Sequence, residues 1–151
     1  MKVTLLLRND HDAIKSLFSK YKKAGARNQN GKKELFEAIR RELTIHSQME
    51  TEIFYPALTG TSSKTASQLV SAAADEHDVV DRMLEEIGAM SPMDRNFDSR
   101  VEDLIKAVDS HIEKEELEIF DEARKTLPEH RLEELGLEME DRKKILGQLA
   151  A

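Results

Sequence analysis

Two copies of one short motif constrain this sequence more than any other feature. A histidine is followed four residues later by a glutamate at His46 and Glu50, and again at His111 and Glu115. Residues four apart lie about one turn apart on the same face of an α-helix. Each copy can therefore direct an imidazole and a carboxylate at one point. The motif predicts a helical protein with polar groups that face inward.

A second pair of histidines shares this spacing, so the chain divides into two similar halves. His11 and His77 are 66 residues apart, while the two histidines of the motif are 65 residues apart, as are its two glutamates. Each half holds a lone histidine followed by the motif. Four histidines and two glutamates, supplied by four expected helices, predict a site for two metal ions.

Apolar residues recur at helical spacing in five segments, which predicts five helices. We expect these helices at residues 4–23, 32–58, 63–88, 94–126 and 129–148. Residues 25–31, 59–63 and 90–93 are rich in Gly, Asn, Ser, Thr or Pro, which is typical of loops. Short loops between long helices favour an all-α, up-down-up-down four-helix bundle with an extra C-terminal helix. We expect a single domain over residues 1–151, with the bundle at about residues 4–126.

Several local features of these helices lead to further expectations. Thr4 is a plausible N-cap for the first helix. Pro56 should kink the second helix or end it early. The long fourth helix has room for an interruption, and Gly136 lowers the helix propensity of the last segment. The inward stripe of that segment is expected at Leu132, Leu135, Met139, Ile145 and Leu149.

Composition excludes several classes of function. The net charge of −7 suits a soluble protein and argues against non-specific binding to nucleic acid. The absence of cysteine excludes disulfides, thiolate metal sites and cysteine nucleophiles. No apolar run approaches the roughly 20 residues of a membrane span, and the N-terminus lacks the features of a signal peptide. We therefore expect no membrane association and a cytoplasmic location.

The histidines and glutamates indicate a metal site only when they are considered together. A single histidine on an apolar stripe is more often a core residue than a ligand, and a bundle without metal is the simplest alternative. However, a buried carboxylate without a partner costs several kcal/mol. Imidazole and carboxylate without sulfur suit iron, manganese or zinc. One glutamate from each half can bridge two ions, which leaves open coordination positions for a small molecule.

The residues around these candidate ligands resemble the motifs of a known protein family. The matching phrases are Asp10-His11, the first motif running into Ile53-Phe54-Tyr55-Pro56, Glu76-His77, and the second motif running into Ile119-Phe120. At these phrases the sequence resembles the hemerythrin-like (HHE cation-binding) family over nearly the whole chain. The resemblance implies a four-helix bundle with a non-haem di-iron centre, oxo- or hydroxo-bridged, rather than manganese or zinc. Carried over by position, the metal ligands would be His11, His46, Glu50, His77, His111 and Glu115, with the two glutamates as bridges.

One position departs from the oxygen-carrying members of that family. They have a further histidine one turn before the ligand of the third helix, where this chain has Ala73. The departure argues against simple reversible O2 storage. It favours an open site that reacts with O2 or hydrogen peroxide in the manner of a catalase. A non-enzymatic protein that senses or stores O2, NO or iron is the alternative.

Some neighbouring residues have secondary roles in this interpretation. Tyr55 is a candidate replacement ligand or hydrogen-bond donor, although a packing aromatic is the simpler interpretation. Glu116 competes with Glu115, which we prefer because four residues keep it on the face of His111. His130 is expected at the surface. The residues expected to orient metal-bound imidazoles are Tyr21, Glu42 and Glu76.

Overall fold

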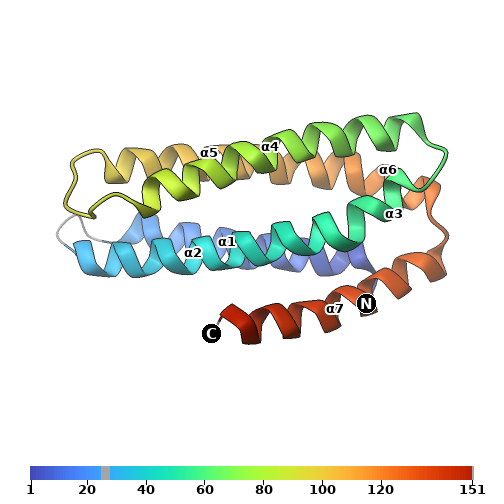
Figure 1. Cartoon of the computed structure of the whole chain (residues 1–151), viewed down its shortest axis with the longest axis horizontal. Helices are drawn as coiled ribbons and strands as arrows, with labels where there is room; N and C mark the ends of the chain where they lie inside the picture. Colours follow the sequence, from blue (N-terminus) through green and yellow to red (C-terminus); the bar gives the residue numbers. More distant parts are fainter. Residues whose placement is uncertain (25–27, 151) are drawn as a thin grey trace.

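Four long helical rods lie side by side, and a fifth helix packs along one edge of them (Figure 1). This computed structural model describes residues 1–24 and 28–150. The rods are α1 (Val3–Lys23); α2 (Gln29–Met49) continued by a π turn (Glu50–Phe54) and α3 (Tyr55–Thr59); α4 (Lys64–Gly88); and α5 (Phe97–Lys114) continued by a π turn (Glu115–Ile119) and α6 (Phe120–Thr126). The fifth helix is α7 (Glu129–Ala150). The all-α bundle with an extra C-terminal helix is as predicted.

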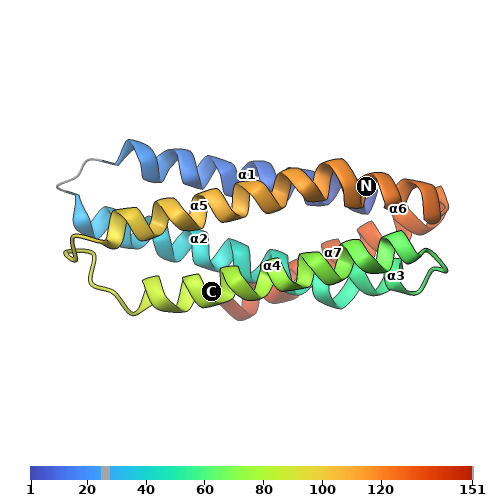
Figure 2. The same ribbon diagram turned by 90° about the horizontal axis from the view of Figure 1, so that it is seen from above.

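The rods form a four-cornered bundle in which neighbours are antiparallel. Helix α1 contacts α2 and α5, and α4 contacts α5 and α2. Figure 2 shows the four rods running along the long axis of the molecule, each consecutive pair joined at an end. None of the helices in the described part of the chain combines the length and apolar character needed to cross a membrane.

The first residues of several helices differ from those expected from the sequence. The side chain of Asn28 caps α2 by accepting a hydrogen bond from the Gly31 N–H, so α2 begins at Gln29. Residues 29–31 are therefore helical rather than loop, while residues 25–27 of that expected loop lie outside the described residues. Thr4 is not the N-cap of α1, because the helix begins at Val3 without a side-chain cap. The fourth rod begins at residue 97, three residues later than expected.

Each rod that carries the motif contains a π turn that begins at the glutamate of the motif. The Tyr55 N–H donates to the Glu50 carbonyl, and the Phe120 N–H donates to the Glu115 carbonyl. Pro56 does not end the second rod early, because it lies in the first turn of α3, where a missing N–H is tolerated. Pro56 closely follows the first π turn, but no proline lies in or directly after the second, so proline is not the common cause. Such turns are frequent at functional sites.

Two apolar clusters fill the bundle on either side of a polar layer. One joins the start of α1, both π-turn regions and α7, and includes Leu7, Met49 and Phe54. The other fills the far end of the bundle and includes Phe36 and Phe97, which pack edge to face. The histidines of the four rods lie close to the boundary between these clusters along the sequence. This arrangement shields the polar layer from water at both ends.

Helix α7 packs against α1, α2 and the first π turn. Gly136 lies in its middle without interrupting it, and a Cβ there would lie 1.8 Å from the Met1 carbonyl oxygen. Glycine therefore permits a close approach between α7 and the N-terminus. The predicted inward stripe is wrong at Ile145 and Leu149, which are 47% and 77% exposed, because Leu146 turns inward instead.

Candidate metal centre

The six predicted ligands converge in the polar layer. They fall into two groups whose potential ligand atoms lie within 4.8 Å of one another. We call the group of His11, His46, Glu50 and Glu115 the first position, and the group of His77, His111, Glu50 and Glu115 the second position. Both glutamates belong to both groups, as expected of bridges. The geometry brings the residues together, and their role as ligands stays a prediction.

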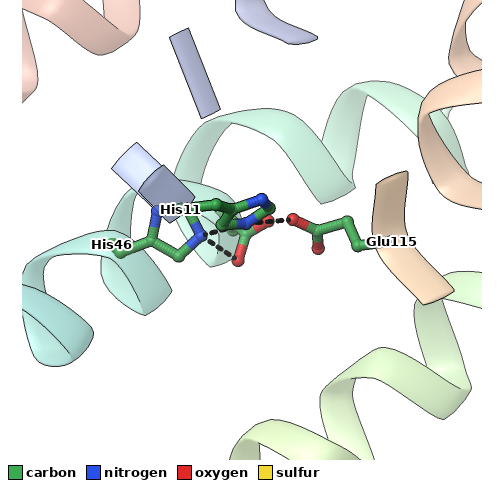
Figure 3. A group of neighbouring side chains, drawn as sticks. His11, His46 and Glu115 are labelled. Atoms are coloured by element: carbon green, nitrogen blue, oxygen red, sulfur yellow. Dashed lines mark hydrogen bonds and ion pairs between the residues drawn. The ribbon is translucent and has the colours of Figure 1, made fainter. Parts of the chain in front are cut away.

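The first position is closely packed and buried. His11 Nε2 and His46 Nε2 lie 3.1 Å apart. Glu50 Oε1 is 3.1 Å from His46 Nε2, and Glu115 Oε1 is 3.1 Å from His11 Nε2. Figure 3 shows His11, His46 and Glu115 directed at a common point from three different rods.

The second position repeats this geometry with slightly longer contacts. His77 Nε2 and His111 Nε2 lie 3.1 Å apart. Glu50 Oε1 is 3.4 Å from His77 Nε2, and Glu115 Oε2 is 3.5 Å from His111 Nε2. His77 is partly exposed, whereas the other five residues of the cluster are buried.

The carboxylate oxygens provide a test of whether these residues fit metal ions. Both oxygens of Glu50 and Oε1 of Glu115 are buried without a hydrogen-bond partner. Buried polar atoms are almost always paired, so three such oxygens in one cluster need an explanation. Four Nε2 atoms face the same oxygens. The nitrogen and oxygen donor set suits a pair of borderline cations such as iron, manganese or zinc.

The ionisable groups confirm that the layer attracts positive charge. Burial alone would lower the pKa of His46, but Glu50 and Asp10 raise that pKa well above its usual value. Burial opposes protonation of His111 too, yet Glu115 and Glu50 raise its pKa to about 9. Burial would raise the pKa of Glu50, but His46 holds it well below the usual range. The negative charge of the two shared carboxylates therefore outweighs the effect of burial on these imidazoles.

A partner on the outer nitrogen holds each imidazole in place. Three of these partners are carboxylates: Glu116 Oε2 at 2.8 Å from His11 Nδ1, Asp10 Oδ2 at 3.3 Å from His46 Nδ1, and Glu76 Oε1 at 3.3 Å from His111 Nδ1. The fourth is the hydroxyl of Ser47, 2.9 Å from His77 Nδ1. Such contacts orient metal-bound histidines and make them better ligands.

Sequence reasoning found some of these partners and missed others. Glu76 orients an imidazole as expected. Tyr21 does not, because its hydroxyl donates to Asp98 Oδ1 at 2.7 Å, away from the cluster. Within the described residues, no hydrogen bond joins Glu42 to a histidine. Asp10 was missed, although it directly precedes His11 as Glu76 precedes His77. That shared position was the available signal.

Three further predictions near the site have clear outcomes. Glu115 joins the cluster, whereas Glu116 contacts the outer nitrogen of His11, which supports the preference for Glu115. Tyr55 is more than a packing aromatic, so the simpler interpretation was wrong. Its hydroxyl donates to Glu115 and lies 3.3 Å from His77 Nε2. His130 is exposed, as predicted.

A cavity of about 30 Å³ adjoins the four imidazoles. Its remaining lining is mainly aliphatic, from Ile14, Leu43, Val80, Val108 and Ile112, with Ser47 and Asp81 as the polar members. Asp81 is exposed, so the cavity approaches the surface near this residue. A space of this volume holds one or two water-sized molecules.

Comparison with known proteins shows to which family the chain belongs. The model of the hemerythrin HHE cation binding domain matches residues 3–123. The chain belongs to this family. The match contains nearly all of the bundle and all six clustered residues, whereas α7 of this HHE chain lies beyond it.

Two similar proteins add further context. The HHE chain is 28% identical, over 148 residues, to a DNA nickase from Nostoc sp.. The alignment covers 98% of this chain but 41% of the nickase, so the chain spans about two fifths of the curated relative. A crystal structure of an HHE cation binding domain-containing protein from Mycobacterium kansasii superposes with a TM-score of 0.85 at 24% identity, covering 97% of this chain and 87% of the other. This likeness supports the fold.

Proposed function

We propose that this HHE domain binds two iron ions in the polar layer and reacts there with hydrogen peroxide or O2, with catalase-like decomposition of peroxide as the favoured reaction. The observation that carries the proposal is the convergence of four imidazole Nε2 atoms on buried carboxylate oxygens that lack hydrogen-bond partners. Two cations would satisfy every one of these atoms.

Iron is favoured over the other metals that suit the donor set. Two imidazoles and shared carboxylates at each position resemble the histidine and carboxylate sets of non-haem iron proteins with open coordination positions. Bound iron would supply the change of oxidation state that reactions of peroxide require, which zinc does not offer. The four histidines would hold the ions, and Glu50 and Glu115 would bridge them.

The cavity limits the size of the substrate. Its volume of about 30 Å³ admits O2 or hydrogen peroxide but excludes larger organic molecules. Ser47 lines the same cavity and offers a hydroxyl to a small polar molecule. The residues of this chain thus select a small substrate by volume.

Tyr55 would hold a proton beside the bridging carboxylate. Burial and the charges of Glu50 and Glu115 raise the pKa of Tyr55 far above its usual value, so the hydroxyl stays protonated and donates to Glu115. Conversion of two peroxide molecules to two water molecules and one O2 is balanced in electrons and needs no separate reductant. The chain would need to supply positioning and proton transfer alone.

A non-enzymatic role in sensing or storing O2, NO or iron is the second candidate. The aliphatic lining of the cavity favours it, because such a lining suits an apolar diatomic molecule. Reversible binding of O2 or NO without turnover would distinguish this role from catalysis.

The test combines metal analysis with an oxygen electrode. The full chain, loaded anaerobically with ferrous iron, should contain about two irons and release O2 steadily from hydrogen peroxide. His46→Ala should lose metal and O2 release. His130→Ala changes an exposed histidine outside the cluster and should retain both. Two bound irons without O2 release would refute the catalase-like reaction, and absence of bound iron would refute the proposal as a whole.

A further inference from the structure

Among the described residues, the lining of the cavity beside the four imidazoles contains one carboxylate, that of Asp81. Asp81 follows His77 by four residues on α4, so both side chains lie on the same face of the helix. Asp81 is exposed, whereas the side chain of His77 is 11% exposed and that of His11 is fully buried. Asp81 therefore marks the outer end of the cavity, and the imidazoles form its inner end.

The position of Asp81 distinguishes it from other acidic residues of the surface. Within residues 1–24 and 28–150, no hydrogen bond or ion pair joins Asp81 to another side chain, and the cavity lining contains no lysine or arginine. Behind the imidazoles lie the carboxylate oxygens of Glu50 and Glu115 that lack a hydrogen-bond partner. An acidic mouth thus leads through a narrow cavity to a layer that attracts positive charge.

Two other grooves lie near the cluster, but each contains a lysine beside the carboxylate that orients a histidine. The groove between α1 and α7 contains Asp10 with Lys143, and the groove between α4 and the end of α5 contains Glu76 with Lys114. In both grooves the lysine forms an ion pair with that carboxylate. None of the six clustered residues lines either groove. A cation in these grooves would meet a positive charge and no ligand atom of the cluster.

The repeat gives the first half no equivalent of Asp81. The offset of 66 residues that relates His77 to His11 also relates Asp81 to Lys15. Lys15 is exposed and does not line the cavity. The acidic mouth therefore belongs to the side of the second position alone.

We propose that divalent cations enter the polar layer at Asp81, whose carboxylate binds the ion at the mouth of the cavity and passes it to His77. The cavity has room for one or two water-sized molecules, so the ion has to leave most of its bound water outside. The Asp81 carboxylate replaces part of that water before the imidazoles are reached. Asp81 belongs to neither group of clustered ligands, so it acts on the passage of the ion and not on its final binding. The inference rests on the proposed metal site.

A residue that acts only on passage changes rates and leaves the equilibrium unchanged. Loss of the Asp81 carboxylate raises the barrier for the ion in both directions, so uptake and release slow by the same factor and the Kd is retained. Loss of a ligand changes the Kd instead. Loss of a charge that merely attracts cations to the surface slows uptake and does not slow release.

Stopped-flow absorption of the metal-free full chain, mixed anaerobically with Co²⁺, measures uptake, and transfer of bound Co²⁺ to excess EDTA measures release. Asp81→Asn should slow both by about tenfold, which corresponds to about 1.4 kcal/mol in each barrier, and should still bind about two Co²⁺ per chain. Asp81→Glu keeps the charge and should restore both rates. Glu85→Gln is the matched control, because it removes an exposed charge one turn further along α4, outside the cavity lining, and should leave both rates unchanged.

Unchanged rates in Asp81→Asn would overturn the inference and leave the dinuclear site intact. Equal slowing in Glu85→Gln, or slower uptake with unchanged release in Asp81→Asn, would also overturn it, because either result would reduce Asp81 to a general electrostatic effect. Fewer bound Co²⁺ in Asp81→Asn than in the unaltered chain would overturn it too, since Asp81 would then contribute to final binding. Failure of the unaltered chain to bind Co²⁺ would instead refute the proposed metal site.

Discussion

The two halves of the bundle have the same backbone plan and different chemistry around it. Each half supplies a lone histidine, the histidine–glutamate motif and a π turn that begins at the glutamate. Yet Tyr55 in the first half corresponds to Phe120 in the second, and Phe120 stacks on the His11 ring at 5.9 Å instead of donating a hydrogen bond. Repetition places the ligands, and the residues that differ between the halves decide how each position behaves.

Helix α7 adds a second asymmetry. Lys143 of α7 forms an ion pair with Asp10, which contacts His46. The corresponding Glu76 pairs instead with Lys114, the last residue of α5. The first position is therefore tied to a helix that lies outside the residues matched by the family model. The second position depends on the bundle alone. Four predictions test these differences, beginning with the largest expected effect.

Loss of a shared carboxylate should remove what the two halves have in common. Because Glu50 and Glu115 belong to both positions, Glu50→Gln and Glu115→Gln should each reduce iron content from about two per chain to below one. The control is Glu52→Gln, which removes an exposed partner of Arg142 and should leave iron content unchanged. Elemental analysis gives the result. A variant of either bridge that keeps two irons would show that the glutamates do not bridge.

Removal of the metal should lower stability markedly. A ligand that binds only the folded chain, present at about 1,000 times its Kd, adds about 4 kcal/mol to the free energy of unfolding. Chelation should therefore lower the Tm of the iron-loaded protein by several degrees. The Tm of His46→Ala should respond weakly to chelator. Identical melting curves for the native chain before and after chelation would contradict a metal in the core.

Tyr55→Phe makes the first half resemble the second. It removes the donor to Glu115, and an unpaired buried acceptor costs about 1–3 kcal/mol. We expect that loss of unfolding free energy in urea titrations of metal-free protein. Tyr21→Phe is the control, since the partner of Tyr21 is the half-exposed Asp98, and its loss should be smaller. Equal losses in the two variants would remove the case for a special role of Tyr55.

The smallest effect should come from the outer lysines. Lys143→Met should reduce the unfolding free energy more than Lys114→Met, because Asp10 is 10% exposed whereas Glu76 is 30% exposed. Both lysines are themselves largely exposed, so each change should cost below about 1 kcal/mol and shrink with added salt. Urea titrations at two salt concentrations measure the difference. A larger loss for Lys114→Met would refute the proposed tie between α7 and the first position.

The helices and the six clustered residues were predictable because both depend on spacing along the chain. Helical periodicity placed the rods, and the repeat placed His11, His46, His77 and His111 on their inward faces. The π turns were not predicted, because each shifts the inward stripe by only about one residue, which a short apolar pattern does not reveal. The direction of the Tyr55 side chain could not be predicted for the same reason. In a regular α-helix, a residue five positions after Glu50 would point away from it. The π turn instead brings the Tyr55 side chain to the same side of the rod as Glu50.

The partners of the outer nitrogens depend on contacts between rods. Ser47 reaches His77 from α2, and Glu116 reaches His11 across the bundle. No spacing within one helix specifies such pairs, because they follow from side-chain directions after the rods have packed. The start of α1 escaped prediction for a different reason. Its first turn is stabilised by burial of Val3 and Thr4 rather than by a capping side chain.

The central claim is that one layer of the bundle holds two metal ions between the halves. Anomalous diffraction at the iron edge, from crystals of the iron-loaded chain, tests it most directly. The account predicts two peaks, one bound by Nε2 of His11 and His46, the other by Nε2 of His77 and His111, with Glu50 and Glu115 contacting both. A single peak, or iron bound away from this layer, would contradict the account.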